Sequence, residues 1–531
     1  MLMKSEKMNK VLLYLLTPLL MMVSCRTNEW EDHYYAEITE KSDLSIFEYL
    51  KSQPELSKFT QMVELTGYDT LLSANQTFTV WAPTNTSLEG FDMNNSDQMM
   101  KTVRNHITRF SVPSSGISSK AILMMNNKWV NFGRNAGVLN LGGKAVTRND
   151  IAVKNGMIHV IGDYVPYVMN IWEYIAVAPG IDSLRNYINS LTRSEFDPQA
   201  SYVDGVLMDS VFNITNKVLT RLGQLSSEDS TYTALLPDNQ AWIEAYNRIF
   251  PFYKTLADDG GAQAQMENTR WSIVRDLFFS QKVALPLSSD SMRSTYGSSL
   301  TNASILFPAN PPAELSNGLA YTSNSLKHKP GDTWNRIIKV EAENASFGRT
   351  QKDFEITNFS SIGTGADISG GFYVNARALS NLSTARLWIN FPIPNTLSGK
   401  YNIYCVFVPI NLTDSTNLRT NKVKFSINYD YVPGVRRDSV WIGNTGFTKT
   451  VGTARNFITD PRKISKVLVV ANYQFPFANL VSTGSRSSDM VTGSKIRVGL
   501  LVENSAGTTT TERLNHIRDL RIDCIILEPV E

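Results

Sequence analysis

Side chains that could hold a transition metal are few in this sequence, and they are widely spaced. The histidines stand at His33, His106, His159, His328 and His516. None pairs with another at the spacing of a local metal site, and the cysteines include no Cys-x-x-Cys pair. We therefore expect no dedicated transition-metal site.

Motifs for nucleophilic or cofactor chemistry are missing as well. The sequence has no Gly-x-Ser-x-Gly, no phosphate-cradling glycine loop and no dinucleotide fingerprint. The two acids of a glycoside hydrolase usually lie far apart in a sequence and leave no local signature, so that class stays open as an alternative. The sequence favours a protein that is not an enzyme and that has no organic cofactor.

Length and charge narrow the remaining classes. At 531 residues the chain exceeds what one hydrophobic core usually supports, which predicts two to four domains. The apolar fraction of 42% and the charged fraction of 19% are typical of folded modules. Since the net charge is only +2, the sequence offers no basic footprint for nucleic acid.

The first 24 residues have the pattern of a secretory signal peptide. Three lysines precede an apolar run over residues 11–23, and Ser24-Cys25 follows. The run is short for a bilayer span and Pro18 interrupts it, which makes a single membrane anchor the weaker alternative.

Cys25 is the predicted site of lipidation. Met22-Val23-Ser24-Cys25 resembles a bacterial lipobox, and residues 25–40 would then form a lipidated tether. The acidic residues of this tether resemble the surface-export signal of Bacteroidota lipoproteins; they are Glu29, Glu31 and Asp32. We expect a lipid anchor in the outer membrane, with the chain facing outward.

The other two cysteines, Cys405 and Cys524, lie in apolar, strand-like runs. We expect them to be buried free thiols that pack as small apolar side chains. A disulfide between them, in an oxidising compartment, is the alternative.

The chain repeats itself over its first two thirds. Residues 46–50 recur as residues 171–175, and each copy opens an amphipathic helical pattern that contains a proline. The three blocks of the repeat, in order, are 46–50 with 171–175, 78–85 with 232–239, and 155–160 with 317–322. The second block predicts a strand that stops at proline before a helix cap, and the third predicts an Asn-Gly turn into a strand.

These blocks resemble the fasciclin domain family, whose members are α+β adhesion and interaction modules. The signature residues of the first copy are Thr79, Pro83, Asn85, His106, Asn155, Gly156 and His159. We expect them to be structural, with both histidines buried and hydrogen-bonded. The resemblance predicts a fasciclin-like domain over residues 41–170 and a divergent one over residues 171–334. The second copy has Tyr321 where the first has His159, and residues 196–229 have the pattern of an insertion.

After Trp334 the pattern changes to short apolar runs separated by Gly, Asn, Ser and Thr, which predicts an all-β sandwich over residues 335–531. The ends of this segment resemble the edges of family 6-like carbohydrate-binding modules, which are jelly rolls. That resemblance implies a structural calcium held by Glu341, Glu343 and Asp523. The alternative is that these carboxylates are solvent-facing strand residues.

Sugar binding would use exposed aromatic faces together with polar side chains. The candidates that flank turn-like segments are Trp441, Asn444 and Tyr473. The alternative is that these aromatic residues belong to the core, as most aromatic residues in strands do.

Two functions remain open. The first is a surface lipoprotein that binds a glycan or glycoprotein and assists a TonB-dependent transporter and its starch-utilisation-type lipoprotein partner, which the layout resembles. The second is a cell-surface adhesion protein that binds matrix or cell-surface proteins through its fasciclin domains.

Overall fold

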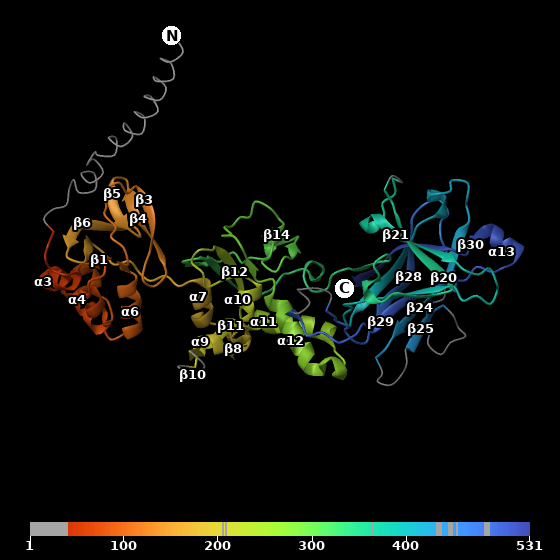
Figure 1. Cartoon of the computed structure of the whole chain (residues 1–531), viewed down its shortest axis with the longest axis horizontal. Helices are drawn as coiled ribbons and strands as arrows, with labels where there is room; N and C mark the ends of the chain where they lie inside the picture. Colours follow the sequence, from red (N-terminus) through yellow and green to blue (C-terminus); the bar gives the residue numbers. More distant parts are fainter. Residues whose placement is uncertain are drawn as a thin grey trace, which may run out of the picture. The chain divides into compact units, whose positions relative to one another are not determined.

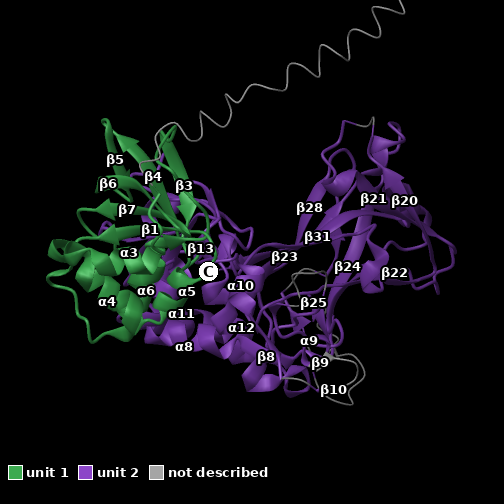
Figure 2. Ribbon diagram, turned by 60° about the vertical axis from the view of Figure 1, so that its left-hand side comes forward, with its two compact units in different colours: residues 1–169 green, residues 170–531 purple. Residues whose placement is uncertain are grey.

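The computed structural model describes residues 41–530 except 204–205, 208–209, 363–364, 432–437, 444–449, 453–454 and 483–488 (Figure 1). The predicted signal peptide, tether, Cys25 and Asn444 lie outside the described residues. The chain divides into two compact units, residues 1–169 and 170–531 (Figure 2). No helix among the described residues is long and apolar enough to cross a membrane.

The first unit packs helices against a mixed sheet. The helices are α3 (Ile46–Ser52), α4 (Ser57–Leu65), α5 (Tyr68–Ser73) and α6 (Ser96–Arg104). The strands run in the order β2-β1-β7-β6-β5-β4-β3. Their bounds are β1 (Phe78–Pro83), β2 (Ile107–Thr108), β3 (Ser119–Leu123), β4 (Trp129–Asn135), β5 (Val138–Leu141), β6 (Lys144–Val153) and β7 (Gly156–Ile161).

The first part of the second unit repeats the centre of this arrangement. Its helices are α7 (Ile171–Val177), α8 (Asp182–Ser190), α10 (Lys217–Arg221), α11 (Asn239–Ile249) and α12 (Gly261–Val274). Its main sheet has the order β13-β12-β17-β16 and comprises β12 (Tyr232–Pro237), β13 (Phe278–Phe279), β16 (Ala313–Leu315) and β17 (Gly318–Ser323). Strand β1 pairs in parallel with β7, and β12 pairs in parallel with β17 in the equivalent register.

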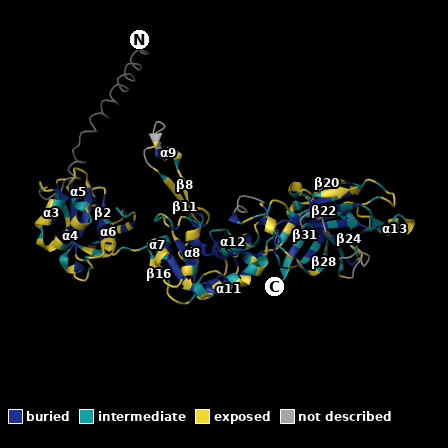
Figure 3. Cartoon of the chain, turned by 90° about the horizontal axis from the view of Figure 1, so that it is seen from below, coloured by how far each residue is buried: buried dark blue, intermediate teal, exposed yellow. Residues whose placement is uncertain are grey.

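The predicted insertion begins as an exposed hairpin (Figure 3). Strand β8 (Thr192–Phe196) pairs with β11 (Phe212–Asn216), so the excursion starts four residues before the predicted one. The short elements α9 (Pro198–Ser201), β9 (Tyr202–Val203) and β10 (Val206–Leu207) lie within this excursion. Further along the chain, β14 (Met292–Arg293) pairs with β15 (Ser299–Leu300) as a separate two-stranded sheet.

Asn155 and Asn317 show how closely the two copies correspond. The Asn155 side chain accepts from Ile46 N (2.8 Å) and donates to Leu72 O and Ala74 O (2.9 and 2.8 Å). Asn317 accepts from Ile171 N (2.9 Å) and donates to the carbonyls of residues 225 and 227 (2.8 and 2.9 Å). Each amide therefore ties the first helix of its copy to the turn before the last central strand. A buried amide with all these bonds fixes its surroundings, which explains why this Asn-Gly pair recurs.

Two sheets make up residues 335–531. The first sheet has the order β20-β21-β31-β23-β28, and β18 also pairs with β31. Its strands are β18 (Ile338–Glu341), β20 (Phe354–Ser360), β21 (Phe372–Ala378), β23 (Lys400–Phe407), β28 (Ser465–Gln474) and β31 (Leu520–Val530). The second has the order β19-β22-β29-β24-β25-β26, with β27 and β30 paired to β24. Its strands are β19 (Thr350–Lys352), β22 (Trp388–Pro392), β24 (Thr420–Tyr429), β25 (Asp438–Ile442), β26 (Thr450–Val451), β27 (Phe457–Ile458), β29 (Val498–Asn504) and β30 (His516–Ile517).

These sheets are consistent with the predicted β-sandwich, because buried residues of both contribute to one core, for example Ile403 and Phe407 with Phe425 and Val502. One short helix, α13 (Thr510–Asn515), interrupts the all-β pattern. The jelly-roll strand order stays a prediction.

The segment that repeats the centre of the first unit lies in the same compact unit as the C-terminal sheets. Arg497 bonds both oxygens of Asp259 from Nε and Nη2 (2.9 and 3.0 Å), and both side chains are nearly inaccessible to solvent. Phe252 packs edge-on against Trp334 with ring centroids 4.8 Å apart. Residues before and after position 334 contribute to one core. The predicted domain boundary between residues 334 and 335 therefore stays a prediction.

Candidate metal centre

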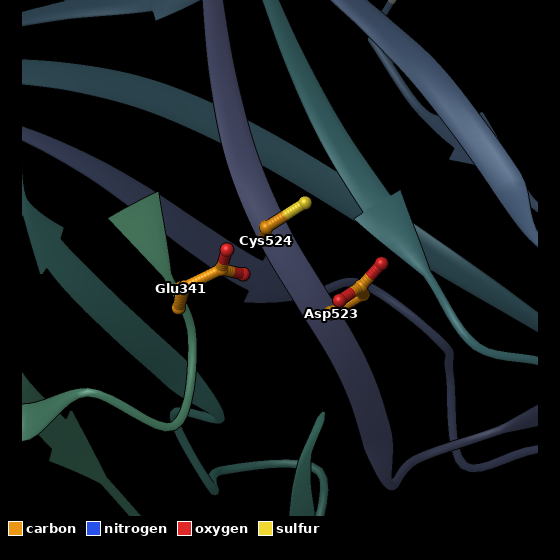
Figure 4. A group of neighbouring side chains, drawn as sticks. All are labelled: Glu341, Asp523 and Cys524. Atoms are coloured by element: carbon orange, nitrogen blue, oxygen red, sulfur yellow. The ribbon is translucent and has the colours of Figure 1, made fainter. Parts of the chain in front are cut away.

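A cluster of acidic side chains lies where the first and last strands of the C-terminal sheets meet. Strand β18 pairs antiparallel with β31, and this register places Glu341 opposite Cys524. Asp523 is the neighbour of Cys524 on β31, and Glu343 stands two residues after the end of β18. Residues that are far apart in the sequence therefore reach one place through strand pairing (Figure 4).

The closest group consists of Glu341, Asp523 and Cys524, whose potential ligand atoms all lie within 4.8 Å of one another. The turn at Ser369 closes the site. Ser369 N donates to both oxygens of Asp523 (3.1 and 3.3 Å), and its hydroxyl donates to Glu341 Oε1 (2.6 Å). Lys339 Nζ in turn donates to the Ser369 hydroxyl (3.1 Å).

Burial and mutual repulsion perturb the acids of this cluster. Burial, together with the charges of Glu341 and Glu343, raises the pKa of Asp523 to about 6. Burial and the Glu341 charge also raise the pKa of Glu343. Carboxylates that lie this close together with only partial access to solvent are stabilised by a cation or a proton near them.

Two carboxylate oxygens of this cluster make no hydrogen bond with the described residues, which favours a bound cation. Glu341 Oε2 and Glu343 Oε2 are buried and have no hydrogen-bond partner among the described residues. A Cβ added to Gly370 would lie 3.3 Å from Glu343 Oε1, so the glycine gives the carboxylate room. Carboxylate oxygens in a partly buried, flexible set are the ligands that Ca²⁺ takes. Glu341 and Asp523 therefore fit a structural calcium, whereas Glu343 lies outside the group whose ligand atoms are within 4.8 Å of one another.

Cys524 supplies the soft donor of this group. Burial and the Asp523 charge raise its pKa to about 12, so the thiol is protonated at neutral pH. A thiol binds zinc as the thiolate, and the remaining donors are hard oxygens. Cys405 and Cys524 are both buried free thiols in the structure.

The two signature histidines lie in the first unit, where each has both ring nitrogens engaged. Val165 N donates to His106 Nε2 (2.9 Å), so Nδ1 carries the proton and donates to Thr102 O (2.7 Å). Burial lowers the pKa of His106 to about 4. His159 Nδ1 accepts from the backbone of residue 150 (3.2 Å), and Nε2 donates to the carbonyl of residue 112 (2.9 Å). Neither ring is available to a substrate or a metal in this arrangement.

The remaining signature residues also make structural contacts. Thr79 donates to Phe110 O (2.6 Å) and accepts from Val112 N (2.9 Å). Asn85 accepts from Lys58 N (2.9 Å), which ties the end of β1 to the start of α4. Gly156 has φ 153°, and an added Cβ would lie 1.9 Å from the carbonyl oxygen of residue 78. Pro83 is buried at the end of β1. Proline has no N–H group to continue the hydrogen bonds of a strand, which fits this position.

The sugar-binding candidates are not brought together. Trp441 lies in β25 opposite Ser426 and points away from its buried neighbours Val440 and Ile442. Tyr473 lies near the end of β28, packs against Phe475 with ring centroids 4.9 Å apart, and borders the core. Burial raises the pKa of the Tyr473 hydroxyl.

The sequence analysis did not identify Ser369, Cys524 or Gly370 as parts of the acidic cluster. Ser369 and Gly370 lie in a turn with no metal motif, and Cys524 has the pattern of a core residue. Only the pairing of β18 with β31 shows that these residues are neighbours, so no local signal could have revealed them.

Comparison with known proteins identifies part of the chain. A fasciclin-domain family model matches residues 54–165. No curated protein matches the sequence.

Three solved structures are similar at low identity. A FAS1 domain pair of the insect cell adhesion molecule fasciclin I is 14% identical, with a TM-score of 0.20, over 52% of this chain and 98% of that chain. The CBM22-1–GH10 modules of Clostridium thermocellum xylanase 10B, complexed with xylohexaose, are 11% identical, with a TM-score of 0.21, over 36% and 28%. A Paenibacillus xanthan lyase is 12% identical, with a TM-score of 0.20, over 39% and 15%. These scores are too low to transfer a function, and the family match alone shows that residues 54–165 form a fasciclin domain.

Proposed function

We propose that this protein is a non-enzymatic, lipid-anchored surface protein that binds a glycan or glycoprotein. The observation that carries the proposal is the fasciclin domain of residues 54–165, a module that suggests an adhesion-like or surface role. The signature residues of this domain are engaged in its own packing, as the bonds of His106 and Asn155 illustrate. Binding would therefore use surfaces of the chain rather than a catalytic cluster.

Calcium has a structural place in this proposal. Glu341, Glu343 and Asp523 would hold the ion and so join the first strand of the C-terminal sheets to the last. The ion would neutralise the repulsion that raises the pKa of Asp523. A bound calcium stabilises the folded state by mass action, since the unfolded chain does not hold these carboxylates together.

The proposal places the protein beside an outer-membrane uptake system. A lipid at Cys25 would tether the binding module near a TonB-dependent transporter and its lipoprotein partner. Tethering raises the local concentration of a ligand, so even weak affinity would assist uptake. The second candidate is adhesion to matrix or to another cell, and the fasciclin domain itself favours it.

Two measurements on intact cells test the proposal. A Cys25→Ser variant should leave the membrane fraction and lose labelled fatty acid, since several acyl chains give stable anchoring. Affinity purification of the wild-type protein from detergent-solubilised outer membrane should recover a transporter. If deletion of the protein leaves growth on complex glycans unchanged and abolishes attachment to matrix, adhesion replaces uptake as the function. Turnover of a polymer by the purified protein would contradict both.

A further inference from the structure

One face of the β22-β29-β24-β25 sheet carries polar residues in place of core residues. Side chains alternate along a strand, and the inward set includes Ile389, Ile427 and Leu500, which are buried in the core. The opposite set includes Asn428 on β24, paired on one side with Gly499 of β29 and on the other with Ser439 of β25. Asn390 of β22 lies on the same face, next to Gly499.

A hollow of about 430 Å³ opens on this face. Its lining includes Asn390, Pro392, Asn428, Tyr429 and Gly499. A Cβ added to Gly499 would lie 2.9 Å from Asn390 Oδ1 and 3.3 Å from the carbonyl oxygen of residue 391. The glycine lets the Asn390 amide lie directly against β29, so this amide forms part of the floor of the hollow. Its volume lies within the range of small-ligand pockets.

The floor presents a buried amide that is not fully satisfied. Asn428 Nδ2 donates to Asn390 Oδ1 (3.0 Å), and the Ser439 hydroxyl donates to Asn428 Oδ1 (2.6 Å). Asn390 is only 4% exposed, yet its Nδ2 donates to no atom of the described residues. Because this nitrogen is not cut off from solvent, it can donate to an acceptor oxygen that a ligand brings into the hollow.

Each charged side chain of the lining has an ionic partner outside it. Arg497 bonds Asp259 through two nitrogens, and Asp430 accepts from Lys495 Nζ (2.6 Å). The hollow therefore presents amide and hydroxyl groups without a charge that needs an ionic ligand. Such a surface suits an uncharged ligand rich in hydroxyl groups.

An aromatic ring extends the same face. Trp441 stands two residues beyond Ser439 on β25, so both side chains lie on one side of the sheet, about 7 Å apart along the strand. An aromatic ring packs on the apolar face of a pyranose, while amides bond its hydroxyl groups.

We propose that this face binds a neutral oligosaccharide. One sugar occupies the hollow over Gly499, where Asn390 and Asn428 bond its hydroxyl groups, and a neighbouring sugar lies on Trp441. The inference rests on the proposed glycan-binding function and gives it a site and a ligand class. This site differs from the sugar-binding residues that the sequence predicted. It keeps Trp441, and Asn390, Asn428 and Gly499 take the place of Tyr473.

Calorimetry on the full-length protein tests this site with cello-, xylo- and manno-hexaose, and with hexagalacturonate as the acidic comparison. At least one neutral hexaose should bind, and hexagalacturonate should bind at least about tenfold more weakly. Asn390→Ala and Gly499→Val should each weaken binding at least about tenfold, by loss of a donor and by filling the hollow. Trp441→Ala, which changes an aromatic residue outside the core, provides a further variant if either of the others fails to fold. Asn515→Ala in α13, an exposed asparagine, is the matched control and should bind as the wild type does.

The outcomes separate the site from the proposed function. If neutral hexaoses bind the wild type and all folded variants equally, the site is wrong while glycan binding stands. If only hexagalacturonate binds, the neutral ligand class is wrong. If none of these saccharides binds and a glycan array is silent, or if an unmodified peptide binds this face instead, the glycan-binding function fails together with the site.

Discussion

Tyr321 and His159 differ in chemistry and yet make the same bond in the two copies of the fold. His159 Nε2 donates to the carbonyl of Val112, and the Tyr321 hydroxyl donates to the carbonyl of Val283, each over 2.9 Å. The valines correspond as well, because Val112 N donates to Thr79 and Val283 N donates to Thr233, again over 2.9 Å. The second copy thus keeps the hydrogen bond after changing the residue that makes it.

Removing that bond should destabilise the second unit. Tyr321→Phe leaves the carbonyl of Val283 without its donor in a nearly inaccessible place, so we expect the free energy of unfolding to fall by about 1–2 kcal/mol. Urea unfolding measures the change. Tyr174→Phe in α7 is the control, since the Tyr174 hydroxyl bonds no atom of the described residues. Equal effects of the two variants would show that the bond to Val283 contributes nothing of its own.

The glycines that precede the repeated strands should not tolerate a side chain. Gly318 has φ 150°, and an added Cβ would lie 1.8 Å from the carbonyl oxygen of Tyr232. This oxygen belongs to the backbone, so it can shift only at a large cost in free energy. We expect Gly318→Ala to cost more than about 3 kcal/mol or to prevent folding. Gly331→Ala is the control, because an added Cβ meets nothing within 4 Å there. Thermal unfolding of the two variants measures the difference, and a Gly318→Ala protein as stable as the control would contradict the close approach.

Acid should weaken the first unit through His106. Its folded-state pKa of about 4 lies below the ordinary value of 6.5, so the unfolded chain binds the proton more readily. Stability is therefore complete above about pH 6.5 and declines as the pH falls towards 4, by up to roughly 3 kcal/mol. Hydrogen exchange of residues 78–83 and 156–161 in the full chain measures this unit separately. His106→Gln should lower stability at pH 7 but should flatten the decline, and an unchanged slope would exclude His106 as its cause.

Short-range patterns predicted the elements well. The short apolar runs expected after Trp334 are found as strands such as β24 (Thr420–Tyr429) and β28 (Ser465–Gln474), because alternating apolar residues indicate burial directly. The repeat also predicted that residue 321 takes the place of His159, although not that it would keep the bond.

Sites that form only when strands far apart in the sequence pair with one another were harder to predict. Glu341 and Asp523 were grouped in the sequence only through a family resemblance, and the turn at Ser369, which bonds both of them, was missed. Asn390 and Gly499 have no motif at all, since their hollow exists only once β22 and β29 lie side by side. Tyr473 was chosen for a nearby turn, but its ring borders the core because β28 packs against the other sheet.

Calcium should stabilise the second unit, and Glu341 should be required for the effect. At a free concentration one hundred times its Kd, the ion should raise the free energy of unfolding by about 2.7 kcal/mol. Glu341→Gln should abolish this increase, whereas Glu314→Gln, an exposed carboxylate of β16, should retain it. Differential scanning calorimetry with calcium and with EDTA measures the increase. A magnesium-specific effect, or an increase that survives in Glu341→Gln, would contradict the assignment.

Without calcium, Asp523 should give the second unit an unusual dependence on pH. Its folded-state pKa of about 6 lies above the ordinary value of 3.8, so the folded state binds the proton more tightly than the unfolded state does. In EDTA, its contribution to stability should therefore be complete below about pH 4 and should be lost as the pH rises towards 6. The charge of Arg349 opposes the rise in the pKa of Glu343 without reversing it. Calcium competes with the proton and should remove the loss. Asp523→Asn should remove it too, because an amide does not ionise, and a metal-free wild type whose stability is flat between pH 4 and pH 6 would show that Asp523 is already neutralised by its neighbours.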